Sequence, residues 1–424
     1  MWLLFFFLIF VLLLISLLIE RDFFAPATLL NGAYLLAIFL AMIRAEDWNF
    51  DIHSETICVI FLGNFIFLLT IAITNILFKK RKIKSELRVI KYDESILNII
   101  MLTNLIMLSI YTFYFLKMFA GLSFGNFYKL ISYYSYHKEI GDNFPLVIAQ
   151  FPKWLRATAY ISVYIIIHNK LIDKKWKTNW KLLFLIMLYL PIPILSAGRF
   201  DLMILFIFAI VYYMLLRRFI LGEKILKPQK IVKFIILIFV GMVAFTNMAS
   251  LVGRTYNSGL INYISGYFGG PLKAFDYYIY QNGLSSVTNE FGPELFAGIK
   301  KLLEQFGFIS NAGVGSETIG DFVILVGDEA ANVYTAYRNV IHDFGITLLP
   351  LFSVIHGFVI NKIYRKAKRG SLESIFVYSI LCFTVILHPF SEFFYSKVLS
   401  FNYLVFFICL FVIEKVLIRQ THKV

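Results

Sequence analysis

Long apolar runs follow one another along almost the whole chain, and no other feature limits the fold so strongly. The first of them, WLLFFFLIFVLLLISLLI at 2–19, contains no charged residue. A continuous apolar run of about 20 residues is the length that an α-helix needs to cross roughly 30 Å of hydrocarbon. Helices satisfy their backbone hydrogen bonds internally, as a membrane requires. The runs do not alternate as the strands of a membrane barrel would, so the sequence predicts an all-α polytopic membrane protein.

Composition supports this class. Of the 424 residues 59% are hydrophobic and 16% charged, and a soluble domain of that make-up could not cover its surface with polar groups. The apolar runs predict about eleven transmembrane helices. Their expected positions are 2–19, 23–43, 56–78, 95–116, 155–168, 181–197, 201–216, 231–250, 344–363, 372–388 and 397–417.

The connecting loops differ sharply in charge, and this difference predicts the orientation. Four strongly basic loops, at 79–91, 169–181, 217–230 and 361–370, fall on one side of the alternating path and are expected in the cytoplasm. The opposite side receives 44–55, 117–154, the short SAGRFD turn, 251–343 and 389–398.

This layout predicts three parts of the chain. They are N-terminal membrane helices with basic cytoplasmic loops at 1–250, one long outward loop with short helices at 251–343, and C-terminal membrane helices at 344–424. The net charge of +14 resides mostly in the basic loops, where it suits membrane lipid headgroups. No segment resembles a nucleic-acid-binding module, so nucleic acid is not an expected partner.

Cysteine usage and short motifs favour neither a metalloenzyme nor an ATPase. Cys58, Cys382 and Cys409 fall inside apolar runs without paired spacing and are expected to be packing residues. The sequence contains no HEXXH, no CXXC pair, no Walker-type glycine loop and no G-X-S-X-G. We therefore expect no metal and no cofactor.

Three arginines stand at the predicted outer ends of membrane helices, where the positive-inside rule gives no need for a cation. They are Arg199, Arg254 and Arg338. A guanidinium donates two parallel hydrogen bonds to a phosphate and does not titrate, so these residues suit a phosphate or pyrophosphate. The alternative is that each one anchors a helix end at the lipid headgroups.

The segment NVYTAYRNVIHDFG at 332–345 combines a cation, a phenol and an imidazole. If it is a helix entering the membrane, Tyr334, Arg338 and His342 lie four apart on one face. Histidine exchanges protons near neutral pH, and Asp343 could orient it. A solvated or helix-packing face is the alternative. The neighbouring stripe is also polar, with Asn332, Thr335 and Asn339.

The long outward loop is rich in aromatic residues around Tyr263 and Tyr267. Aromatic faces beside polar groups suit sugar rings, which stack their C–H faces and form hydrogen bonds at their edges. An amphipathic segment resting on the bilayer is the alternative.

Several of these short motifs together resemble the bacterial O-antigen polymerases, the Wzy-type repeat-unit polymerases. The motifs are S-x-G-R at 196–199, G-R-T at 253–255 followed by Y-I-S-G at 263–266, and the block at 332–345. The resemblance implies a fold similar to the C-type glycosyltransferases, in the bacterial inner membrane with the active site facing the periplasm. It implies an undecaprenyl-pyrophosphate-linked oligosaccharide as substrate and a separate chain-length regulator protein as partner.

Under that resemblance the residues take specific roles. Arg199, Arg254 and Arg338 would hold the pyrophosphate in place of a metal ion, and His342 with Asp343 would activate the acceptor hydroxyl. Weaker candidates for the base are Glu317, Asp328 and Glu329, and weaker candidates for sugar contacts are Tyr334, Asn332, Tyr263 and Tyr267.

Two alternatives stay open at this stage. A lipid-linked oligosaccharide flippase would carry its ionisable residues in the middle of its membrane helices, and an O-antigen ligase would use the same donor with a different acceptor. Charge is nearly absent from the middle of the predicted helices and the sequence shows no internal repeat, which disfavours a flippase. The sequence does not separate a ligase from a polymerase.

Overall fold

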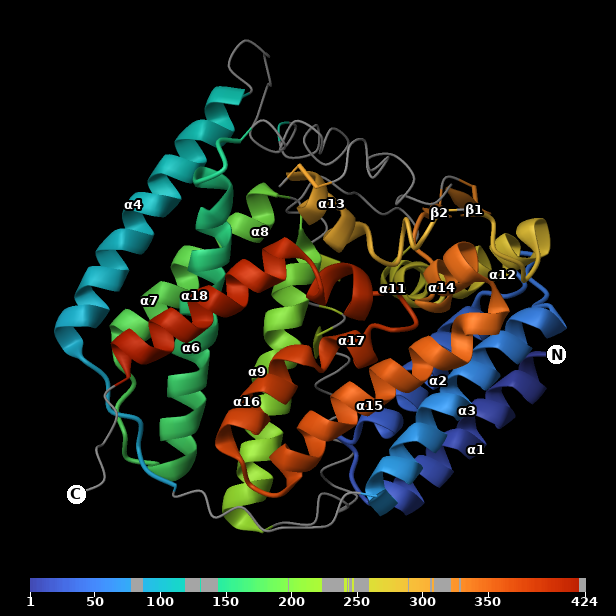
Figure 1. The fold of residues 1–424 in the computed structure, drawn as a ribbon, viewed down its shortest axis with the longest axis horizontal. Helices are drawn as coiled ribbons and strands as arrows, with labels where there is room; N and C mark the ends of the chain where they lie inside the picture. The colour runs from blue at the N-terminus through green and yellow to red at the C-terminus, as the bar shows by residue number, and fades with distance from the viewer. Residues whose placement is uncertain are drawn as a thin grey trace. The chain divides into compact units, whose positions relative to one another are not determined.

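The computed structural model describes the chain except for a set of loops and one terminus, and helices predominate in the described part (Figure 1). The described residues are 1–77, 87–118, 130, 144–196, 198–222, 240–241, 243, 246–247, 259–288, 290–305, 307–308, 322–327 and 329–418.

The chain divides into two compact units, and neither is continuous in sequence. Unit 1 comprises Met1–Lys84, Lys224–Phe234 and Ser258–Phe401. Unit 2 comprises Ser85–Glu223, Ile235–Asn257 and Asn402–Val424. Helices from both ends of the sequence therefore contribute to unit 1.

Long apolar helices form the body of unit 1, where α3 packs along α15 and α1 packs along α2 (Figure 1). The helix α2 begins with Pro26, a position at which the missing N–H of proline costs no hydrogen bond. Gly357 of α15 lets this helix approach α3, because an added Cβ would lie 3.3 Å from the Phe67 ring. The bounds are α1 (Trp2–Glu20), α2 (Pro26–Ile43), α3 (Ser54–Leu77), α15 (Leu349–Lys368) and α16 (Leu372–Leu381).

Shorter elements complete unit 1. They are α11 (Leu260–Phe268), α12 (Gly270–Asn282), α13 (Ala297–Gln305), β1 (Val323–Val326), β2 (Glu329–Ala331), α14 (Tyr337–Phe344), η3 (Ile346–Leu348), α17 (Phe383–Ile386) and η4 (Phe394–Val398). The strands pair in antiparallel fashion, with Val323 opposite Ala331. This small hairpin departs from the all-α fold that the sequence predicts.

The connections of unit 1 gather at opposite ends of its long helices. At one end the His53 ring lies 2.7 Å from the Asp276 carboxylate, which joins the 44–55 loop to α12. At the other end Lys368 lies 3.3 Å from Glu20, which joins the end of α15 to the end of α1. The 44–55 loop and α12 therefore meet at one end of the unit 1 helices, and the ends of α1 and α15 meet at the other.

Unit 2 is a second group of helices. Its elements are α4 (Glu94–Met118), η2 (Ile148–Gln150), α6 (Phe151–Ile172), α7 (Trp180–Tyr189), α8 (Pro191–Leu195), α9 (Arg199–Leu221) and α18 (Phe401–Leu417), the last beginning at the unit boundary. α6 packs on α7 and on α9. The predicted helix at 181–197 is interrupted in the structure between Tyr189 and Pro191, since a proline cannot donate the backbone hydrogen bond that would continue it.

Among the described residues, six helices are long and apolar enough to cross a membrane. They are Trp2–Glu20, Pro26–Ile43, Ser54–Leu77, Glu94–Met118, Phe200–Leu221 and Ile346–Lys368, and shorter apolar helices occur at Trp180–Leu195 and Leu372–Ile386. The protein is thus a helical membrane protein. Most of the predicted helix at 231–250 lies outside the described residues.

Candidate functional site

A buried cluster of charged side chains surrounds α14 in unit 1. Arg338 of α14 forms an ion pair with Glu294, and the side chain of Glu294 is only 2% exposed. The guanidinium carbon of Arg338 lies 5.0 Å from the centre of the Tyr278 ring and 5.1 Å from that of the Tyr334 ring. The aromatic rings and the carboxylate therefore hold the arginine in one place. We call Arg338, Glu294, His342, Asp343, Tyr278 and Tyr334 the α14 cluster.

The geometry of a short helix explains why Arg338 and His342 both face Glu294. They are four residues apart, which places both on one face of α14. Val340 and Ile341 are buried and anchor the helix. Gly345 ends it with a φ of 68°, a conformation that glycine adopts without strain.

Asp343 ties the histidine to the neighbouring loop. Its carboxylate accepts hydrogen bonds from the backbone N–H of Glu294 at 3.1 Å and of Leu295 at 2.7 Å. The Nδ1 atom of His342 lies 3.0 Å from Asp343 Oδ1. When the Nδ1–H group donates a hydrogen bond to Asp343, the lone pair of Nε2 is available as an acceptor.

Glu294 lies between two basic groups. Its Oε1 atom is 3.8 Å from His342 Nε2 and has no hydrogen-bond partner within the described residues. Burial raises the pKa of the Glu294 carboxyl, while Arg338 and His342 act in the opposite direction. Burial also raises the pKa of the Tyr278 phenol to about 12, although the nearby Arg338 lowers it. The two carboxylate oxygens of Glu294 thus face different basic groups, Oε2 the guanidinium of Arg338 and Oε1 the imidazole of His342.

The prediction that 332–345 forms a single helix entering the membrane is wrong. Residues 332–335 are not helical, α14 begins at Tyr337, and Gly345 separates it from α15. The chain leaves β2 at Ala331, and the backbone N–H of Ala336 donates to the carbonyl of His388 at 2.9 Å. These tertiary contacts override the helical spacing. Tyr334 still reaches Arg338, but through the approach of the extended segment and not through a helical turn.

The other predicted site residues divide between described and undescribed positions. Arg254, Glu317 and Asp328 lie outside the described part, and so does the side chain of Arg199. Arg199 itself is the first residue of α9 in unit 2. The proposed grouping of three arginines therefore remains a prediction.

The described weaker candidates lie in several places of unit 1. Tyr263 and Tyr267 are neighbours on α11, with ring centres 4.9 Å apart. Asn332 is half-buried and follows β2. Glu329 lies 3.5 Å from Arg44, a buried arginine at the end of α2. The structure brings together Arg338, His342, Asp343 and Tyr334.

Sequence reasoning missed Glu294 and Tyr278. Glu294 precedes its partner Arg338 by 44 residues and lies in the stretch FGPELFAG. A single acid inside an otherwise apolar outward segment was the available signal, but no local pattern assigns it to α14.

Arg156 in unit 2 was missed as well. It is 8% exposed, donates to the hydroxyl of Tyr403 at 2.8 Å and lies 3.6 Å from Asp201. Its guanidinium carbon is 4.7 Å from the centre of the Phe406 ring. Arg156 therefore joins α6, α9 and α18 through contacts that no spacing in the sequence predicts.

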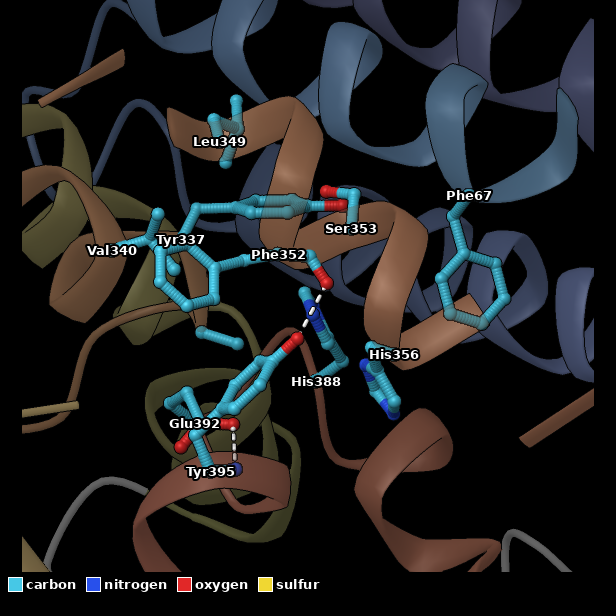
Figure 2. Close-up of a pocket in the computed structure, with 11 residues that line it drawn as sticks. Phe67, Tyr337, Val340, Leu349, Phe352, Ser353, His356, His388, Glu392 and Tyr395 are labelled. Carbon is cyan, nitrogen blue, oxygen red and sulfur yellow. Dashed lines mark hydrogen bonds between the residues drawn. The ribbon is translucent and has the colours of Figure 1, made fainter. Parts of the chain in front are cut away.

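A small cavity lies beside α14 in unit 1 (Figure 2). Its volume is about 20 Å³, enough for a water molecule and far too small for a sugar. Figure 2 shows Tyr337 above His388, with His356 next to it and Glu392 and Tyr395 below. The cavity is a water-sized space lined by both apolar and polar side chains.

The described residues hold no group of three or more His, Cys, Asp or Glu side chains arranged to bind a metal ion. The three cysteines are free. Fold and site together define a helical membrane protein with a buried polar cluster around a short helix. No model of a protein family, no curated protein and no solved structure matches the chain.

Proposed function

We propose that this protein is a membrane glycosyltransferase that polymerises undecaprenyl-pyrophosphate-linked oligosaccharide repeat units. The product is O-antigen or capsular polysaccharide, made at the periplasmic face of the inner membrane. The observation that carries the proposal is the α14 cluster, in which an oriented histidine and a buried arginine–carboxylate pair adjoin at 3.8 Å. The cluster lies in the predicted outward loop, where a lipid-linked substrate would present its sugar.

The cluster can move the proton that glycosyl transfer releases. The acceptor hydroxyl gives its proton to Nε2 of His342 as its oxygen bonds to the anomeric carbon of the donor. The bond from that carbon to the pyrophosphate oxygen breaks at the same time, and undecaprenyl pyrophosphate leaves as an anion. Asp343 keeps the imidazole oriented, and Glu294 stabilises the imidazolium that forms.

Arginines neutralise the leaving group in this proposal. The guanidinium of Arg338 neutralises charge that develops on a pyrophosphate oxygen, and Arg199 and Arg254 stay the further guanidinium groups that the sequence predicts for this role. Preorganised donors of this kind stabilise charge that develops in the transition state. Transfer then needs no metal ion, because guanidinium groups carry out the neutralisation.

An O-antigen ligase would use the same donor chemistry, and a flippase would use the same lipid-linked substrate. The oriented His342–Asp343 pair favours an enzyme over a flippase, since transport requires no proton acceptor for a hydroxyl. A polymerase and a ligase differ in the acceptor molecule, which the product of the reaction identifies.

The surface polysaccharide of a strain that lacks this protein tests the proposal. We expect lipopolysaccharide or capsule with a single repeat unit, restored to a ladder by the wild-type gene on a plasmid. A complete absence of repeat units would overturn the polymerase proposal in favour of a ligase or flippase, and an unchanged ladder would overturn all three.

A further inference from the structure

Tyr337, the first residue of α14, lies next to Arg338 but is fixed inside the helices of unit 1. Its side chain is 3% exposed, and its hydroxyl donates to Asn64 Oδ1 at 2.6 Å. The amide of Asn64 donates to Asn31 at 3.2 Å, and that of Asn31 donates to Ser16 at 3.1 Å. A buried chain of hydrogen bonds therefore runs from α14 through α3 and α2 to α1.

The ring of Tyr337 also packs closely against Gly63 of α3. An added Cβ on Gly63 of α3 would collide with the Tyr337 ring and hydroxyl, so only glycine leaves room for it. The ring of Tyr34 stacks on Tyr337 with centres 5.9 Å apart, and the ring of His388 meets its edge at 4.7 Å. In Figure 2 the Tyr337 ring lies above His388 at the cavity wall. Shape and hydrogen bonding together leave the side chain one position.

A buried hydroxyl without a partner is costly, so the Tyr337–Asn64 hydrogen bond sets the position of α14 relative to α3. Arg338 and His342 project from the other side of the same short helix, toward Glu294. Any shift of Tyr337 would move both groups, because a helix of this length moves as one body.

We propose that Tyr337 is a positioning residue, seated by Gly63 and Asn64, that aligns Arg338 and His342 with Glu294. Its catalytic consequence rests on the proposed function, whereas its effect on α14 does not. Asn64, which lies 273 residues before Tyr337 in the sequence, thereby contributes to the geometry of the α14 cluster.

The test uses Tyr337→Phe, which keeps the ring and removes the hydroxyl, in the full-length purified protein. We expect amide hydrogen exchange in residues 337–344 to become about tenfold faster, as the loss of one buried hydrogen bond implies. Exchange in α3 and α15 should stay unchanged. In polymerisation assays kcat should fall by a similar factor with little change in KM, because Arg338 and His342 act on charge and a proton that develop in the transition state. Tyr280→Phe, at a tyrosine that is 68% exposed, is the matched control and should change neither quantity.

Asn64→Leu provides a second, independent variant. If Tyr337 acts through Asn64, then Asn64→Leu combined with Tyr337→Phe should affect exchange no more than the larger single change does. Additive effects on exchange would contradict the claim that Tyr337 holds α14 through Asn64. Unchanged exchange in residues 337–344 would contradict it as well. Faster exchange with unaltered kcat would overturn the positioning role. A wild-type protein without transferase activity would defeat the proposed function alone, since exchange still decides whether Tyr337 holds α14.

Discussion

At the scale of single residues, Glu294 is the group on which the α14 cluster most depends. Its carboxylate neutralises Arg338 and faces His342, and its backbone N–H donates a hydrogen bond to the Asp343 carboxylate. Removing one partner of a buried ion pair leaves the other charge without compensation, which costs more than the pair itself contributes. The carboxylate therefore has a structural effect that can be measured apart from catalysis.

We expect Glu294→Gln to lower the free energy of unfolding by about 3 kcal/mol, because the buried Arg338 charge loses its counterion. Thermal unfolding of the detergent-purified protein measures the loss. Glu290→Gln is the matched control, since the Glu290 side chain is 67% exposed and forms only a surface pair with Lys300. Equal midpoints for the two variants would show that the Arg338–Glu294 pair is not the constraint described above.

Arg199 tests whether the outward arginines bind pyrophosphate. Lysine keeps the charge but loses the planar fork that donates two hydrogen bonds, so Arg199→Lys should shorten or abolish the polymer ladder at normal protein levels. Arg254→Lys should do the same. Arg21→Lys, at an exposed position just beyond α1, is the control and should leave the ladder intact. A normal ladder from Arg199→Lys would favour a helix anchor at the membrane surface, where either cation serves.

At the scale of elements, the sequence identified the apolar helices well and the short elements poorly. A run of about 20 apolar residues has few alternatives to a helix, whereas α14 and the β1–β2 hairpin depend on contacts that no local pattern contains. Helical spacing correctly placed Arg338 and His342 on one face because both lie inside α14. It failed at Tyr334, where strand β2 and the carbonyl of His388 determine the path of the chain.

Gly345 is the residue that separates α14 from α15, and its replacement tests that boundary. Gly345 has a φ of 68°, and an added Cβ would lie 3.0 Å from the backbone N of Ser286. Gly345→Ala should therefore destabilise the protein by about 1–3 kcal/mol, measured by thermal unfolding.

Gly283→Ala isolates the backbone contribution to that effect. Gly283 has a similar φ of 72° with nothing near its added Cβ, so its replacement should cost backbone strain alone and destabilise the protein less than Gly345→Ala does. The same midpoint for both variants would show that the contact with Ser286 does not constrain the turn.

At the scale of the whole molecule, ion pairs join segments at the ends of the long helices in unit 1. The ion pairs His53–Asp276 and Lys368–Glu20 lie at opposite ends of the unit 1 helices, and the side of the membrane that each end faces stays a prediction of the positive-inside rule. The division into units was beyond sequence reasoning, because α15 and α16 return to pack with the N-terminal helices and no local pattern encodes that return.

Reporter fusions test the orientation of the chain. Those at residues 85, 175, 224 and 367 lie in strongly basic loops and should report the cytoplasm. Those at 48, 300 and 393 should report the periplasm, with position 300 lying close in sequence to Glu294. A cytoplasmic signal at 300 would place the α14 cluster on the wrong side for the proposed reaction.

The central claim is that the α14 cluster transfers glycosyl groups without a metal ion, and reconstituted polymerisation tests it most directly. Purified protein in liposomes receives undecaprenyl-pyrophosphate-linked repeat units in the presence of EDTA. We predict polymer and released undecaprenyl pyrophosphate from the wild type, and none from His342→Gln, which still binds the lipid-linked donor. Activity that disappears with EDTA and returns with magnesium or manganese would contradict the arginine mechanism, and full activity of His342→Gln would contradict the site.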